Sequence, residues 1–99
     1  MKSWCLYLDD LRSPPADGRD YLVARTPDEA MGLIRARGLP AFMSLDHDLG
    51  PDLDTMQFLQ SLYREFPHPP SFPEYHVHSA NPVGRANIIS FLESWRRSL

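Results

Sequence analysis

Short apolar segments alternate with helix-like segments along this chain, and this alternation limits its fold more than any other feature. We expect strands at residues 4–8, 20–25, 41–45 and 75–78, and helices between Thr26 and Gly38, at 53–66 and at 82–95. Strands that alternate with helices form parallel βαβ units in a layered α/β domain. A chain of 99 residues fits one such domain, which we expect to span residues 1–99.

The links between these segments carry start and stop signals. Thr26 suits the cap of the first helix, since Pro27 follows it and Glu29 completes a capping box. Asn81 and Pro82 form a similar start for the last helix. By contrast, residues 10–18 contain two prolines and a glycine and are too short for an ordinary crossover helix. We therefore expect an irregular loop there, and a sheet that is more open beside it.

Composition excludes several classes of protein. The net charge of −3 argues against an extensive surface for duplex nucleic acid, because backbone binding depends on basic charge. No apolar stretch approaches the roughly 20 residues that cross a bilayer, so we expect no membrane partner. Cys5 is the single cysteine and cannot form an internal disulfide. With no sign of a signal peptide, we expect the protein in the cytoplasm.

Ionisable residues follow three of the four expected strands. The carboxyl ends of parallel strands meet at one edge of the sheet, where open α/β folds place their sites. These segments are Asp9-Asp10-Leu11-Arg12, Asp46-His47-Asp48 and His78-Ser79-Ala80-Asn81. We expect them to form one site.

Three of these acids have the chemistry of a metal site. Mg²⁺ binds a few carboxylate oxygens together with water and, commonly, a substrate phosphate. Asp9, Asp10 and Asp46 are the expected ligands of a divalent cation, Mg²⁺ or Mn²⁺. The alternative is that these acids cap turns or lie in solvent.

Two histidines lie close to these acids in the expected site. Histidine transfers protons well near neutral pH, especially when a carboxylate holds it. We therefore place His47 and His78 with Asp46 in a catalytic group. The alternative is that each histidine is a polar residue near the surface.

The same region contains groups that suit a phosphate. Guanidinium groups bind phosphate oxygens in a forked geometry, and helix N-termini favour anions. Arg12, Ser79, Asn81 and Arg85 are the expected phosphate-binding residues. Arg85 is as well explained as an arginine on a helix surface.

These motifs resemble those of receiver domains in two-component signalling. In such a domain Asp9 and Asp10 would bind Mg²⁺, Asp46 would accept a phosphoryl group and Ser79 would be the switch hydroxyl. The chain differs from such a domain in three ways. We expect neither the fifth strand nor the first helix of a receiver, and the phosphate-binding lysine is missing because the single lysine, Lys2, cannot take its place.

The motifs are closer to those of a receiver-derived family, the cyclic-phosphate-processing receiver domains. The matching segments are Leu8 to Arg12, Ser44 to Gly50 and His78 to Gly84. One departure is Leu53-Asp54-Thr55, where the family usually has a glycine. The resemblance implies a receiver-like (flavodoxin-like) three-layer sandwich, truncated to four mostly parallel strands in the order 2-1-3-4 and three helices.

The resemblance also implies a function. The family is thought to process RNA ends or nucleotides that bear a cyclic phosphate, in RNA repair or in phage–host conflict, with RNA-repair enzymes as functional partners. We therefore expect a metal-assisted cyclic phosphodiesterase. The alternatives are a non-catalytic module that binds a nucleotide or phosphate and a degenerate phosphoacceptor receiver.

Overall fold

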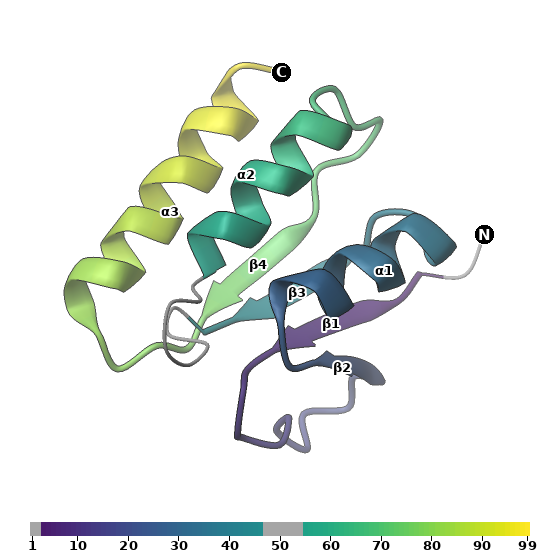
Figure 1. Cartoon of the computed structure of the whole chain (residues 1–99), viewed down its shortest axis with the longest axis vertical. Helices are drawn as coiled ribbons and strands as arrows, with labels where there is room; N and C mark the ends of the chain where they lie inside the picture. Colours follow the sequence, from purple (N-terminus) through teal and green to yellow (C-terminus); the bar gives the residue numbers. More distant parts are fainter. Residues whose placement is uncertain (1–2, 47–54) are drawn as a thin grey trace.

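Four short strands form one sheet in the computed structural model, which describes residues 3–46 and 55–99 (Figure 1). The strand order is β2-β1-β3-β4, and every pair of neighbours is parallel. In this part of the chain the strands are β1 (Cys5–Leu8), β2 (Tyr21–Ala24), β3 (Phe42–Leu45) and β4 (Glu74–Val77), and the helices are α1 (Pro27–Arg37), α2 (Thr55–Glu65) and α3 (Pro82–Arg97). The strand order and the three helices confirm the expected receiver-like α/β fold.

The helix boundaries follow the predicted signals. The Thr26 hydroxyl accepts a hydrogen bond from the backbone N–H of Glu29 at 3.1 Å, and the Glu29 carboxylate accepts one from the N–H of Arg25 at 2.7 Å. Gly38 ends α1 with a φ of 85°, which glycine adopts without strain. Asn81 caps α3, as predicted.

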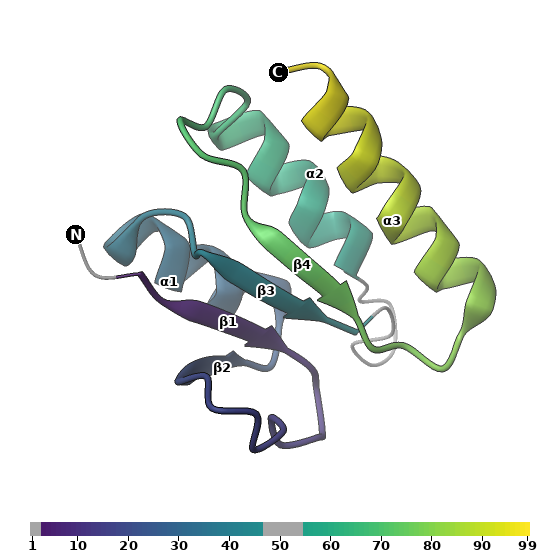
Figure 2. The ribbon, with the colours of Figure 1, turned by 180° about the vertical axis from the view of Figure 1, so that it is seen from behind.

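The helices are arranged unevenly about the sheet. α1 crosses in front of β1 and β3 in Figure 1 and behind them in Figure 2, and α2 and α3 run side by side in both views. α1 joins β2 to β3 and α2 joins β3 to β4, so both connections progress across the sheet in the same direction. Right-handed crossovers therefore place both helices on the same face. α1 and α2 therefore cover the same face of the sheet, and α3 packs against α2 and β4.

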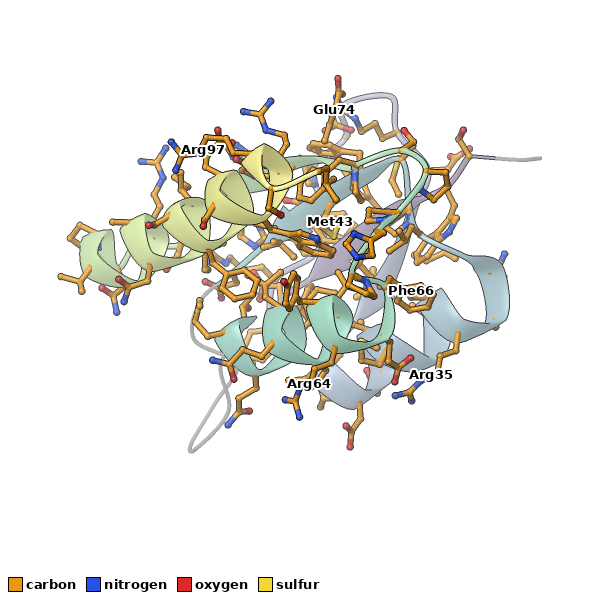
Figure 3. All side chains as sticks on the ribbon, turned by 90° about the horizontal axis from the view of Figure 1, so that it is seen from above. Arg35, Met43, Arg64, Phe66, Glu74 and Arg97 are labelled. Atoms are coloured by element: carbon orange, nitrogen blue, oxygen red, sulfur yellow. The ribbon has the colours of Figure 1, made fainter. Side chains whose placement is uncertain are left out.

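The hydrophobic core lies between the helices and the face of the sheet that they cover. Leu6 and Leu8 of β1 and Met43 and Leu45 of β3 are fully buried there, together with Phe58 of α2. Figure 3 shows Met43 in the interior, while Arg35 and Arg64 project outward from α1 and α2. Side chains alternate between the two faces along a strand, so the residues between these core residues lie on the opposite face of the sheet.

In the part of the chain that the structure describes, side chains and not a helix from the β1–β2 link lie over the opposite face. The link between β1 and β2 contains no helix, as predicted, and its Arg19 guanidinium lies 4.1 Å from the ring centroid of Phe42. Tyr7 packs edge-on against Tyr21 with a centroid separation of 5.7 Å. This face, which we call the open face, is therefore polar and aromatic. Within residues 3–46 and 55–99, no helix has the length and apolar character that crossing a membrane requires.

Candidate functional site

Asp9, Asp46 and His78 are each the first residue after a strand, and they lie in one row across the sheet. The backbone N–H of Asp46 donates to the carbonyl of Leu8, and that of His78 to the carbonyl of Leu45, both at 2.9 Å. These bonds continue the parallel ladder by one residue beyond β1, β3 and β4. As a result, the ligand atoms of the three side chains lie within 4.8 Å of one another.

Asp9 is at the centre of this group and is fully buried. Its Oδ1 accepts from the backbone N–H groups of Leu11 and Arg12, at 2.9 and 2.8 Å. Its Oδ2 accepts from Arg12 Nε at 2.9 Å, His78 Nε2 at 3.0 Å and the Tyr7 hydroxyl at 3.5 Å. Burial alone would raise the pKa of Asp9, but these donors outweigh it and lower the pKa. Asp9 is therefore a carboxylate at neutral pH.

His78 is held on three sides on the open face. Its Nε2 faces Asp9, its Nδ1 lies 2.8 Å from the Ser44 hydroxyl, and its ring stacks on Tyr7 with centroids 4.9 Å apart. Burial lowers the pKa of His78 and outweighs the attraction of Asp9, so the ring is neutral at pH 7. Since a carboxylate only accepts, Nε2 carries the proton, and Nδ1 accepts from Ser44.

Arg12 joins the two carboxylates. Its Nε lies 2.9 Å from Asp9 Oδ2 and its Nη2 lies 3.3 Å from Asp46 Oδ2. The side chain of Arg12 is 53% exposed, whereas those of Asp9 and Asp46 are almost entirely buried. Arg25 fixes the backbone beneath it, because its Nη1 donates to the carbonyl oxygens of Asp9 at 3.0 Å and Arg12 at 2.6 Å. A half-exposed cation thus lies over two nearly buried anions.

Comparison with known proteins assigns this arrangement to a family. The family described as cyclic-phosphate processing receiver domain matches residues 4–94, which include all four strands and every residue of the site. The chain belongs to this family. No curated protein and no solved structure matches it. The sequence-based identification of the family is therefore confirmed.

This cyclic-phosphate processing receiver domain brings together only part of the predicted site. Asp9, Arg12, Asp46 and His78 converge, whereas Asp10 is half-buried and does not belong to the cluster. His47 lies outside the described residues.

The predicted phosphate-binding residues near α3 have local contacts. The Ser79 hydroxyl accepts from the backbone N–H of Asn81 at 3.1 Å. Asn81 Oδ1 accepts at 3.1 Å from both backbone N–H groups at the start of α3. Arg85 is exposed in the first turn of that helix. Asn81 is thus engaged as a helix cap.

Sequence reasoning missed three residues that shape the site, namely Tyr7, Ser44 and Arg25. Tyr7 and Ser44 pair in the register of β1 and β3 and precede Asp9 and Asp46 by two positions. Their place on the same face follows from strand alternation, which could have identified them. Nothing local in the sequence marks Arg25, because its partners are backbone carbonyls in another segment.

A cavity of about 700 Å³ lies at the opposite edge of the sheet. It is bordered by the starts of β3 and β4 and by the proline-rich segment, including Leu39, Pro40, Phe72 and Pro73. None of its lining residues belongs to the acid cluster. Its walls are mostly apolar, and the charged residues that line it are Arg37 and Glu74, with no histidine and no second acid beside them. We therefore assign the chemistry to the carboxyl ends of the strands.

The cluster fits a divalent cation in its donor chemistry. The two carboxylates are ordinary ligands for Mg²⁺ or Mn²⁺, whereas an imidazole is more typical of softer transition-metal ions. The Arg12 guanidinium bridges both carboxylates and shows that this position holds positive charge. A cation bound to Asp9 Oδ2 or Asp46 Oδ2 would take an oxygen that the Arg12 side chain now contacts.

Proposed function

We propose that this domain hydrolyses a cyclic phosphodiester, such as a 2′,3′-cyclic phosphate at an RNA end, with the help of Mg²⁺ or Mn²⁺. The observation that supports it most is the meeting of Asp9, Asp46, His78 and Arg12 at one sheet edge in a chain of this family. A bound divalent cation would neutralise a phosphate oxygen and lower the pKa of a bound water.

In this proposal Asp9 and Asp46 hold the cation. Both side chains are nearly buried, so they are kept in place before any ligand arrives. Arg12 binds the non-bridging phosphate oxygens and stabilises the charge that develops on them. Its half-exposed side chain can reach a ligand at the surface.

Two histidines, His47 and His78, move the protons. Water adds to phosphorus as the bond from phosphorus to one ribose oxygen breaks, which converts the cyclic diester into a monoester. One histidine takes the proton of the attacking water, and the other gives a proton to the departing oxygen. Each such group contributes typically 10²- to 10⁴-fold. The tight hold of Asp9 and Ser44 on His78 supports a defined proton position there.

The test is an assay in which ³¹P NMR monitors the hydrolysis of an oligonucleotide that ends in a 2′,3′-cyclic phosphate, with Mg²⁺ or Mn²⁺ present. We expect His78→Gln and Asp46→Asn each to lower the rate by roughly 10²- to 10⁴-fold. His76→Gln is the matched control, because His76 is exposed on β4 two positions before His78. The absence of turnover by the intact protein, or equal rates for His78→Gln and His76→Gln, would disprove the proposal.

A second candidate is a module that binds such a phosphate without hydrolysing it. Both ring nitrogens of His78 already have hydrogen-bond partners, which suits a fixed binding surface as well as a proton carrier. Recovery of the oligonucleotide unchanged after tight binding would favour this function.

A further inference from the structure

The Asp9 carboxylate has no oxygen to spare for a metal ion. Five donors converge on its two oxygens, and three of them share Oδ2. A carboxylate offers about four lone-pair sites. A cation can therefore bind Asp9 only by replacing a donor that is now in place.

Among the four donors within 3.0 Å of the Asp9 carboxylate, Arg12 Nε is the one that can leave most readily. The two N–H donors to Oδ1 belong to the backbone of the loop, and Arg25 clamps this loop through two carbonyl oxygens. His78 is held by Ser44 and by the Tyr7 ring. The Arg12 side chain, in contrast, is half-exposed, and rotation about its side-chain bonds leaves the backbone contacts unchanged.

The release of Arg12 changes the charge of the site in a useful direction. The two carboxylates and the guanidinium together carry one net negative charge, which disfavours a phosphate. A divalent cation neutralises the carboxylates and leaves the guanidinium free, so the same residues carry one net positive charge. Coulomb attraction to a phosphate then replaces repulsion.

We infer that Arg12 is a built-in counter-cation that a divalent metal ion displaces from Asp9 and Asp46, and that the released guanidinium then binds the phosphate. This inference rests on the metal site of the proposed function but not on hydrolysis. It requires an order of binding in which the metal ion comes first. Arg12 then has opposite effects on the two ligands, because it competes with the metal ion and binds the phosphate.

The first experiment measures Mn²⁺ binding by isothermal titration calorimetry in the full chain. We expect Arg12→Gln to bind Mn²⁺ roughly three- to tenfold more tightly, as loss of a partly exposed competing ion pair should allow. Arg12→Lys should lie between this variant and the unmodified protein, because an ammonium group cannot bridge two carboxylates in the same way. Arg19→Gln is the control for loss of charge, since Arg19 contacts Asp17 and Phe42 and should leave the affinity unchanged.

The second experiment uses adenosine 3′-phosphate as a probe that has no cyclic bond to hydrolyse. We expect it to bind the unmodified protein only when Mn²⁺ is present, and to bind Arg12→Gln at least about tenfold more weakly, as the loss of a charge-assisted contact predicts. Thermal unfolding of each variant checks that the fold is intact.

The outcomes separate this inference from the proposed function. Equal or weaker Mn²⁺ binding by Arg12→Gln, or equal binding of the probe without Mn²⁺, would overturn the role of Arg12. No Mn²⁺ binding by either protein would overturn the metal site as well. Opposite effects on the two ligands in a protein that does not hydrolyse the cyclic phosphate would support Arg12 and disprove the hydrolase.

Discussion

The two faces of the sheet differ in what covers them and in what they contain. On the face under α1 and α2, every second residue of β1 and β3 is a fully buried aliphatic or methionine side chain. On the open face the same strands carry Tyr7 and Ser44, followed in the same alternation by Asp9 and Asp46. One face therefore stabilises the fold, and the other collects polar groups.

This difference arises from the short link between β1 and β2. A crossover helix after β1 would lie on the open face, because β2 lies on the opposite side of β1 from β3. The irregular link therefore places no helix on that side of β1, and the half-exposed Arg12 of this link lies over the buried Asp9 and Asp46 instead. The sequence feature that removes a helix thus also supplies the arginine of the site.

The largest expected effect is on the covered face. Phe58→Ala should lower the free energy of unfolding by about 3–5 kcal/mol, because Phe58 is fully buried and its loss leaves a cavity. Val23→Ala, on the open face with 37% exposure, should cost less than about 1 kcal/mol. Urea denaturation measures both. Similar losses for the two variants would show that the open face also has a hydrophobic core.

A smaller effect is expected at the centre of the open face. Ser44→Ala removes the hydroxyl that bonds to His78 Nδ1, and a buried polar group left without a partner costs about 1–3 kcal/mol. The change should also appear in the ¹⁵N NMR shifts of His78, which report the position of its ring proton. Ser71→Ala, at an exposed serine, is the control. Unchanged His78 shifts would show that the Ser44 hydroxyl does not donate to His78 Nδ1 in solution.

Asn81 tests whether the start of α3 belongs to the site or only to the fold. Asn81→Ala should lower stability by about 1 kcal/mol, the usual cost of losing an N-cap. Asn87→Ala, at an exposed position inside α3, should not destabilise, since alanine has the higher helix propensity. Affinity for adenosine 3′-phosphate in the presence of Mn²⁺ should be the same in both variants. A selective loss of this affinity in Asn81→Ala would support the phosphate-binding role predicted from sequence.

The sequence predicted the elements well because their signals are local. Apolar runs, Thr26 and Asn81 as caps, and the prolines between β1 and β2 each act within a few residues. The edge of the sheet that carries the site follows from parallel topology alone.

The details of the site depend on distant contacts, so they could not be predicted in the same way. The bridge from Arg12 to Asp46 and the clamp of Arg25 on the loop after β1 join segments far apart in the chain. Asp10 resembles Asp9 in sequence, yet only Asp9 lies in the row shared with Asp46 and His78. Local sequence identifies ionisable residues, whereas register decides which of them meet.

The last and smallest expected effect is on stability at high pH, and it concerns Tyr75 of β4. Burial, with help from the nearby Glu93 carboxylate, raises the pKa of Tyr75 to about 12 from its ordinary value of 10.0. The folded protein therefore keeps this proton more firmly than the unfolded chain does. The associated stability is complete below pH 10 and is lost as the pH rises through about 12.

Tyr75→Phe should remove this contribution, so its stability should fall less steeply between pH 10 and 12 than that of the unmodified protein. Tyr75 is partly exposed, and after allowance for solvent screening the difference should be about 1 kcal/mol. Urea titrations at several pH values in this range measure it. Tyr7, whose pKa is raised by burial and by Asp9, stays in both proteins and so cancels in the comparison. Equal slopes would show that the contact between Tyr75 and Glu93 does not persist in solution, and that α3 is held to the sheet by apolar packing alone.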